Sequence, residues 1–146
     1  MADSNAPIKS FTAEYAFLSN FYQHAGYLSN EHFYQASKTF DKEWKQKIMA
    51  ATTPGKAKRL GSKCPMYPAF PSERVDIMLK LVRTKFKNPY LAKKLCETST
   101  RPLIEGNHWH ENFWGECSCD DCKDKNKLNM LGFVLMTIRA EILHGG

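Results

Sequence analysis

The sequence lacks long apolar runs, a leader-like N-terminus, internal repeats and low-complexity segments. About 20 consecutive apolar residues are needed for a helix to span a bilayer. No run approaches that length, so we expect no association with a membrane. Residues 1–7 also lack the basic stretch followed by an apolar stretch that marks a secretion signal. We therefore predict a cytoplasmic protein in which residues 1–7 form a disordered tail.

The number of cysteines is odd, so they cannot all be paired within the chain. An odd number of thiols without a secretion signal argues against a disulfide framework, so we expect reduced thiols. The five positions are Cys64, Cys96, Cys117, Cys119 and Cys122. The last three resemble part of a structural zinc site, with His108 or His110 as a fourth ligand. The alternative is that they are reduced thiols packed in a loop. Catalysis is not expected to require a metal or any other cofactor.

The remaining composition is that of an ordinary globular domain. Hydrophobic residues make up 42% of the chain and charged residues 25%. A length of 146 residues suits one domain with one core, so we expect a single domain over residues 1–146, as a monomer. The formal net charge of +6 favours anionic partners such as phosphates, nucleotides, DNA or RNA.

Helix signals dominate the chain after residue 30. Residues 8–28 mix aromatic residues with turn formers, which predicts short strands and loops. We then expect helices over 31–40, 43–51, 54–61, 72–86 and 89–95, a short strand at 103–105 and a long loop over 108–127. A last helix should turn one apolar stripe to the core: Leu128, Leu131, Leu135, Ile138 and Ile142. The prediction is an α+β fold, a mainly helical, single compact domain with a few short strands.

The segment 31–38 places three polar side chains on one predicted helical face. At 100° per residue, Glu31, Gln35 and Lys38 fall within about 60° of one another, and Tyr34 lies at the edge of that face. A carboxylate, an amide and an amine on one face suit ligand binding and proton transfer. The alternative is a solvated face with weak charge pairing. The opposite face is apolar and can anchor the helix: Phe33, Ala36 and Phe40.

Three further segments carry candidate binding residues. Asn20 and Phe21 follow an aromatic stretch and form either a capped turn or part of a binding site. Trp114–Gly115 lies in the predicted long loop, where the indole either covers the core or stacks on a base or ribose. Asn129 either caps the last helix or holds a ribose hydroxyl or phosphate there.

Together these segments resemble the NADAR family, also called YbiA-like proteins, from about residue 11 to the last helix. Each motif is short, and the ordered set is specific. The matching segments are FLSNF at 17–21, EHFYQASK at 31–38, PGKAKRLG at 54–61, Ile-Met at 77–78, Lys-Phe at 85–86, WG at 114–115 and NMLGFVLMTIR at 129–139. The resemblance implies a compact, mainly helical α+β fold and an enzyme that cleaves an N-glycosidic bond to ribose.

The same motifs supply the candidate site residues. Glu31 and Lys38 are the expected catalytic pair. The expected substrate-binding residues are Asn20, Phe21, Tyr34, Gln35, Phe70, Trp114, Gly115 and Asn129. The chain departs from the family pattern before the long helix, where Ala69–Phe70 keeps an aromatic ring but not the polar residue that often precedes it. A neighbour such as Glu73 or Asp76 would have to supply that polar group.

The catalytic pair suits a glycosylamine substrate, because a ribose that carries an amine at C1 can open to an imine. A lysine that is neutral part of the time can exchange with this imine and form a Schiff base. A carboxylate can move the protons, an effect typically worth ~10²–10⁴-fold in rate. The alternative is direct hydrolysis through an oxocarbenium-like state, with Glu31 activating water.

Three functions follow as hypotheses. The resemblance implies removal of ADP-ribose from guanine bases of nucleic acid, which we expect first, or cleavage of phosphoribosylamino-pyrimidine intermediates of riboflavin synthesis. The third hypothesis is a non-enzymatic module that binds ADP-ribose or nucleic acid. Its affinity would depend on salt and on basic groups rather than on the catalytic pair. Those groups are Lys56, Lys58, Arg59 and Lys63.

Overall fold

The computed structural model describes residues 5–145, which fold into two compact units. The central unit consists of residues 20–85, and the terminal unit combines residues 5–19 with residues 86–145. Each unit is described by itself. Within residues 5–145, every helix is too short or too polar to cross a membrane.

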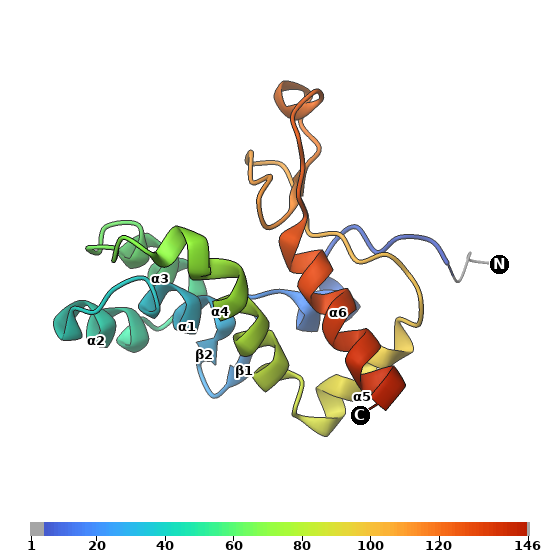
Figure 1. The fold of residues 1–146 in the computed structure, drawn as a ribbon, viewed down its shortest axis with the longest axis horizontal. Coiled ribbons are helices and arrows are strands. Elements are labelled where there is room, and N and C mark those ends of the chain that lie inside the picture. The colour runs from blue at the N-terminus through green and yellow to red at the C-terminus, as the bar shows by residue number, and fades with distance from the viewer. Residues whose placement is uncertain (1–4, 146) are drawn as a thin grey trace. The chain divides into compact units, whose positions relative to one another are not determined.

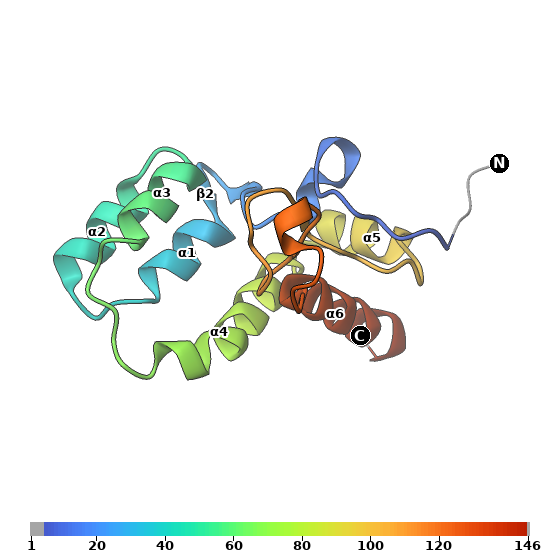
Figure 2. The ribbon, with the colours of Figure 1, turned by 90° about the horizontal axis from the view of Figure 1, so that it is seen from above.

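The central unit is a group of four helices beside a short hairpin (Figure 1). The hairpin pairs β1 (Gln23–Ala25) with β2 (Leu28–Ser29) in antiparallel orientation. The helices are α1 (Asn30–Ala36), α2 (Lys42–Ala50), α3 (Pro54–Gly61) and α4 (Phe70–Lys85). Helix α1 packs against the other three, and Figure 2 shows α2 and α3 beside it. The short helix α1 is therefore the centre of this unit.

Local signals explain where these helices begin. The Ser29 hydroxyl accepts a hydrogen bond from the backbone N–H of His32, and the His32 ring accepts one from the backbone N–H of Ser29. At α3 the Thr53 hydroxyl accepts a hydrogen bond from the backbone N–H of Lys56, and Pro54 occupies the first turn. The apolar sides of α1, α2 and α3 then meet in one buried cluster: Ala36, Ile48, Ala51 and Ala57, with Met49, Leu60 and Cys64 packed against it.

The terminal unit contains two α-helices that pack together, α5 (Pro89–Glu97) and α6 (Met130–Gly145). It also holds two 3-10 helices, η1 (Ala13–Leu18) and η2 (Asp120–Cys122), and a parallel pair of two-residue strands, β3 (Gly106–Asn107) and β4 (Glu116–Cys117). We call residues 106–129 the arm, because this segment projects beyond the N-terminal end of α6 in Figure 1. The structure confirms the predicted α+β class, with helices dominant and few strands.

The predicted first helix was too long. Helix α1 ends at Ala36, so Lys38 lies in the turn that follows it. The backbone N–H of Tyr67 donates to the Lys38 carbonyl at 3.0 Å, a contact from a distant part of the chain that replaces a further helical turn. Phe40 was expected on the anchoring face but is 74% exposed. It stacks on the Tyr67 ring with 4.4 Å between centroids.

Smaller corrections concern helix starts and the last apolar stripe. Helix α4 begins at Phe70, two residues before the predicted start at 72, and the Ser72 hydroxyl donates to the Ala69 carbonyl. Leu128 precedes α6 and is 40% exposed, and Ile142 is only half-buried. The core-facing stripe is therefore shorter than predicted, and its fully buried members are Leu131, Leu135 and Ile138.

The chain ends of the terminal unit also differ in detail. The predicted strand at 103–105 is reduced to one parallel bridge between Leu103 and Ile8. Residues 1–4 of the expected tail lie outside the described residues. Asn5 accepts a hydrogen bond from the Thr100 hydroxyl, and the Ala6 carbonyl accepts one from the Arg101 guanidinium.

Candidate active site

A buried carboxyl–amide pair lies on α1. Gln35 Nε2 donates to Glu31 Oε1 at 2.6 Å across one helical turn. Both side chains are buried, with 7% of Glu31 and 3% of Gln35 exposed. Gln35 Oε1 is also buried and has no hydrogen-bond partner among the described residues. The pair is therefore buried together, and Gln35 Oε1 is left as an unsatisfied acceptor.

Burial disfavours the negatively charged form of Glu31. Burial raises the pKa of the Glu31 carboxyl, because a charged group loses hydration there. The hydrogen bond from Gln35 and the positive charges of Lys58 and Lys38 oppose this rise but do not cancel it. Glu31 therefore keeps its proton to a higher pH than an ordinary glutamate, which suits a group that must donate and accept protons.

Lys38 is the second half of the predicted catalytic pair. Its side chain is half-buried, and its Nζ lies 5.8 Å from the centroid of the Tyr34 ring. Burial lowers the pKa of the Lys38 amine, and the nearby charge of Glu31 opposes that shift. Lys38 and Glu31 therefore lie close enough for their charges to interact, although Lys38 lies beyond the end of the helix. A lysine with a lowered pKa is neutral more often and is then nucleophilic.

Two aromatic rings, one from α1 and one from α4, pack against each other next to the predicted catalytic pair. The Tyr34 ring lies 5.5 Å from the Phe70 ring, centroid to centroid. Phe70 is only 2% exposed, so it packs in the core and contacts Tyr34. The suggested replacements for the polar residue missing before α4 are both exposed, and Glu73 accepts a hydrogen bond from the Tyr67 hydroxyl at 2.7 Å.

The segment before the hairpin contributes a second contact to α1. The Asn20 carbonyl accepts a hydrogen bond from the Glu31 backbone N–H at 2.9 Å, and Asn20 is 7% exposed. Phe21 next to it is 44% exposed, and Lys58 Nζ lies 5.9 Å from its ring centroid. Lys58 therefore contacts an exposed ring, and its positive charge also acts to lower the pKa of Glu31. In the sequence it was only one of several basic residues.

Gly61 at the end of α3 was not singled out, although it closes one of the matching motifs. A Cβ atom at this position would lie 1.9 Å from Gln35 Oε1 and 2.8 Å from Gln35 Cβ. Only glycine leaves room for the Gln35 side chain in its present place. The fixed glycine of the motif is the signal that pointed to this contact.

Lys85 at the end of α4 is a further group that sequence reasoning missed. It is 3% exposed, and its Nζ lies 5.5 Å from the centroid of the Tyr22 ring. Burial lowers the pKa of Lys85 to about 7. A buried lysine of this kind is typical of functional sites, and its position in the Lys-Phe motif was the available signal.

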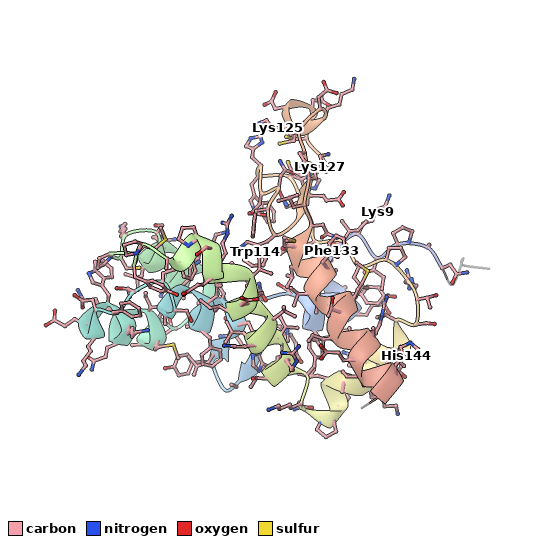
Figure 3. All side chains as sticks on the ribbon, in the orientation of Figure 1. Lys9, Trp114, Lys125, Lys127, Phe133 and His144 are labelled. Atoms are coloured by element: carbon pink, nitrogen blue, oxygen red, sulfur yellow. The ribbon has the colours of Figure 1, made fainter. Side chains whose placement is uncertain are left out.

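The arm holds Trp114 and Gly115 through a carboxylate. Glu111 Oε2 accepts hydrogen bonds from the backbone N–H groups of Trp114, at 2.7 Å, and Gly115, at 3.0 Å. A Cβ atom at Gly115 would lie 2.2 Å from the Glu105 carbonyl oxygen, so glycine is required there. Figure 3 shows Trp114 near the start of α6, where Phe133 lies, and Lys125 farther out along the arm. Glu111 was not anticipated from the sequence.

Asn129 connects the arm to the strand region of the terminal unit. Its Oδ1 accepts from the Glu105 backbone N–H at 3.0 Å, and its Nδ2 donates to the Leu103 carbonyl at 2.9 Å. Its φ of 47° lies in the left-handed region that asparagine tolerates better than most residues. Both amide atoms are engaged within the protein, which favours a structural role for this side chain.

The predicted site residues thus fall into two local groups. The central unit brings together Asn20, Phe21, Glu31, Tyr34, Gln35, Lys38 and Phe70, and the terminal unit holds Trp114, Gly115 and Asn129. The first group contains both chemical groups that the predicted reaction needs, so the chemistry can be argued within the central unit alone.

Comparison with known proteins indicates the family and the fold of this chain. A family model described as the NADAR domain matches residues 4–143. The solution structure of the Escherichia coli protein YbiA superposes with a TM-score of 0.80 at 24% identity, covering 97% of this chain and 88% of that one. At this identity the likeness shows a shared fold.

Three curated relatives add sequence similarity at greater identity. N-glycosidase YbiA of Escherichia coli is 30% identical over 118 residues, which cover 78% of this chain and 69% of YbiA. A riboflavin biosynthesis protein of Vibrio vulnificus is 33% identical over 137 residues, and the chloroplastic riboflavin biosynthesis protein PYRR of Zea mays is 31% identical over 128. The matched regions cover 88% and 77% of this chain but only 36% and 19% of those two relatives.

Proposed function

This chain belongs to the NADAR domain family, and on that premise we propose that it is an N-glycosidase that hydrolyses the bond between ribose C1 and an amine. The observation that carries the proposal is the buried Glu31–Gln35 pair beside the half-buried Lys38. The acid holds its proton more tightly than usual and the amine holds it less tightly, so both groups can change protonation state during a reaction. A relative named as an N-glycosidase supports the same reaction class.

In the proposed mechanism, protonated Glu31 gives its proton to the ribose ring oxygen. The bond between C1 and the ring oxygen breaks, and C1 becomes doubly bonded to the nitrogen of the base. Neutral Lys38 Nζ then adds to C1, the Glu31 carboxylate carries the proton that Nζ loses to the nitrogen of the base, and the base leaves as a free amine. Glu31 regains its own proton from the water that adds in the next step. Water adds to the resulting Lys38 imine and releases the sugar, which closes its ring again. The sum is the consumption of one water and the cleavage of one C1–N bond.

As the substrate we propose ADP-ribose joined to guanine of DNA or RNA. The chain carries a net charge of +6, which favours the anionic diphosphate and nucleic acid. The exposed Phe21 ring with Lys58 beside it offers a stacking surface next to a positive charge. A base and a phosphate are the two parts of such a substrate that these groups would bind.

A second candidate substrate is a phosphoribosylamino-pyrimidine intermediate of riboflavin synthesis. The observation in its favour is that two relatives carry riboflavin biosynthesis in their names. The reacting atoms are the same, because this compound also joins ribose C1 to an exocyclic amine. The two candidates differ in what lies beyond the ribose, a diphosphate with adenosine or a single phosphate.

The function is tested by mass spectrometry of products. The full chain is incubated with DNA that carries ADP-ribosylated guanine and, in parallel, with the phosphoribosylamino-pyrimidine. We expect unmodified guanine and free ADP-ribose from the first substrate. Release of the free pyrimidine amine from the second substrate alone would replace the proposed substrate but keep the reaction class.

The matched control is Glu31→Gln, which keeps the size and hydrogen-bonding capacity of the side chain but removes its acidity. Turnover of neither substrate by the folded wild-type chain, with binding of ADP-ribose unaffected by Glu31→Gln, would contradict the enzyme and favour a binding module.

A further inference from the structure

Four potential metal ligands meet in the arm. His110, Cys117, Cys119 and Cys122 each offer one ligand atom, and these four atoms all lie within 4.8 Å of one another. Cys117 and Cys122 are fully buried, while His110 is exposed at the edge of the group. The sequence left His108 and His110 as alternatives for the fourth ligand. The structure separates them, because His108 Nδ1 is hydrogen-bonded to the Ser118 hydroxyl instead.

The spacing of these atoms suits a tetrahedral zinc ion. Zinc bonds of ~2.3 Å to sulfur and ~2.0 Å to nitrogen place two sulfur ligands about 3.8 Å apart and a sulfur–nitrogen pair about 3.5 Å apart. Here His110 Nδ1 lies 3.3 Å from both Cys119 Sγ and Cys122 Sγ, and Cys117 Sγ lies 3.3 Å from Cys119 Sγ. These three pairs would have to open by a few tenths of an ångström, and the widest separation in the group, up to 4.8 Å, would have to close by about 1 Å to admit the ion.

The groups around the sulfurs are those that stabilise thiolates. The His110 backbone N–H donates to Cys117 Sγ, and Asn112 Nδ2 donates to Cys122 Sγ, each at 3.3 Å. Asn112 also fixes the backbone of the cluster, because its Oδ1 accepts from the Cys117 N–H at 2.8 Å. Hydrogen bonds of this kind orient metal ligands and reduce the charge that builds up on three sulfurs.

We propose that His110, Cys117, Cys119 and Cys122 form a structural zinc site that orders the arm. Four protein ligands close the coordination sphere, which is the pattern of structural rather than catalytic zinc. The chain enclosed by these ligands, residues 110–122, contains Glu111 and the Trp114–Gly115 turn that it holds. Zinc would therefore fix the conformation in which the arm presents Trp114, whatever the substrate of the enzyme is.

Metal analysis of the purified full chain tests this site directly. After desalting, we expect about one zinc per wild-type chain and little zinc in Cys119→Ser and in His110→Ala. The matched controls are Cys96→Ser and His108→Ala, which change the same residue types outside the ligand set and should keep the zinc. A zinc-free wild-type chain that also fails to take up added zinc would overturn the proposal. So would equal zinc in Cys119→Ser and Cys96→Ser.

Cobalt substitution of the wild-type chain gives a second measurement that needs no variant to fold. We expect the intense visible bands of tetrahedral Co²⁺ together with thiolate-to-cobalt charge transfer. Weak bands typical of six-coordinate cobalt, without charge transfer, would show that these cysteines do not bind the ion and would overturn the proposal.

Discussion

Glu31 is held where its own charge is unfavourable, and this has a consequence for stability. Its pKa is raised in the folded chain, so the protonated form is favoured by folding. The stabilising contribution is complete below the pKa of glutamate in the unfolded chain and is lost as the pH rises through the folded pKa. Above the pKa of glutamate in the unfolded chain, therefore, Glu31 lowers the free energy of unfolding relative to a side chain that does not ionise.

Glu31→Gln should accordingly lower turnover ~10²–10⁴-fold while it stabilises the fold at neutral pH. The amide carries no charge at any pH, so the cost of burying a group that favours ionisation in water is removed. Thermal unfolding followed by circular dichroism should give a higher Tm for the variant at neutral pH, with the difference shrinking as the pH falls toward the usual glutamate pKa. A lower Tm at neutral pH and near-normal activity would remove Glu31 from the mechanism.

Gly61 shows how a residue without a side chain can position a functional group. Gly61→Ala should gain up to about 1 kcal/mol from helix propensity. Overpacking against Gln35 should cost about 1–3 kcal/mol, so the net effect is destabilising. Displacement of Gln35 from Glu31 should also lower kcat by roughly tenfold, since one hydrogen bond to a charged group is worth about 1.5–3 kcal/mol.

The matched control for this variant is Gly55→Ala in the same helix, where an added Cβ meets nothing within 4 Å. It should leave kcat unchanged. Equal losses of activity in the two variants would show that Gly61 acts only through the flexibility of α3, and that its contact with Gln35 is unimportant.

At the scale of elements, the helices could be placed from the sequence, but the end of α1 could not. The predicted starts at residues 54 and 89 match α3 and α5, where Pro54 and Pro89 follow the caps Thr53 and Asn88. The end of α1 depends instead on the bond between the Tyr67 N–H and the Lys38 carbonyl, which joins residues far apart in the chain. A periodicity of 3.6 residues carries no information about such a tertiary contact, so it also misplaced Phe40.

The arm offers a test of a contact that the sequence did not reveal. Glu111→Ala removes the acceptor for the backbone N–H groups of Trp114 and Gly115. We expect a loss of about 2 kcal/mol in stability, since hydrogen bonds to charged groups contribute about 1.5–3 kcal/mol each and part of this is recovered by solvation. Tryptophan fluorescence should change as the indole leaves its place beside the Phe113 ring.

Glu116→Ala, a change of the same residue type in the same arm, is the control for this experiment and should have little effect. If both variants unfold at the same denaturant concentration and with the same spectrum, the Glu111 carboxylate does not hold the Trp114–Gly115 turn.

For the whole molecule, the sequence supplied the fold class and the family through an ordered set of motifs, and the match to residues 4–143 confirms the family. It also supplied Glu31, Gln35 and Lys38 as neighbours. The sequence could not show that both amide atoms of Asn129 form hydrogen bonds with the backbone, because those bonds depend on where residues 103–105 lie in the fold. The position of Asn129 in a motif was equally consistent with binding a substrate and with holding the backbone in place.

The distribution of functional groups over the two units gives a further expectation. The proposed chemistry uses Glu31 and Lys38 of the central unit, whereas the proposed zinc ligands belong to the terminal unit. Brief treatment with a chelator should therefore leave kcat unchanged, while long incubation should make the arm sensitive to proteases. Rapid loss of turnover that added zinc restores, without a change in the circular dichroism spectrum, would place the metal in the reaction.

The most direct test of the catalytic centre is borohydride trapping on Lys38. A Schiff base between Nζ and C1 is reduced to a stable secondary amine, which peptide mass spectrometry can assign to one lysine. With ADP-ribose or the cleaved substrate present, we expect an adduct on Lys38 in the wild type and none in Lys38→Arg, which should also lose turnover. No adduct on Lys38, together with a Lys38→Arg variant that keeps most of its turnover, would contradict the covalent mechanism and leave Lys38 a purely electrostatic role.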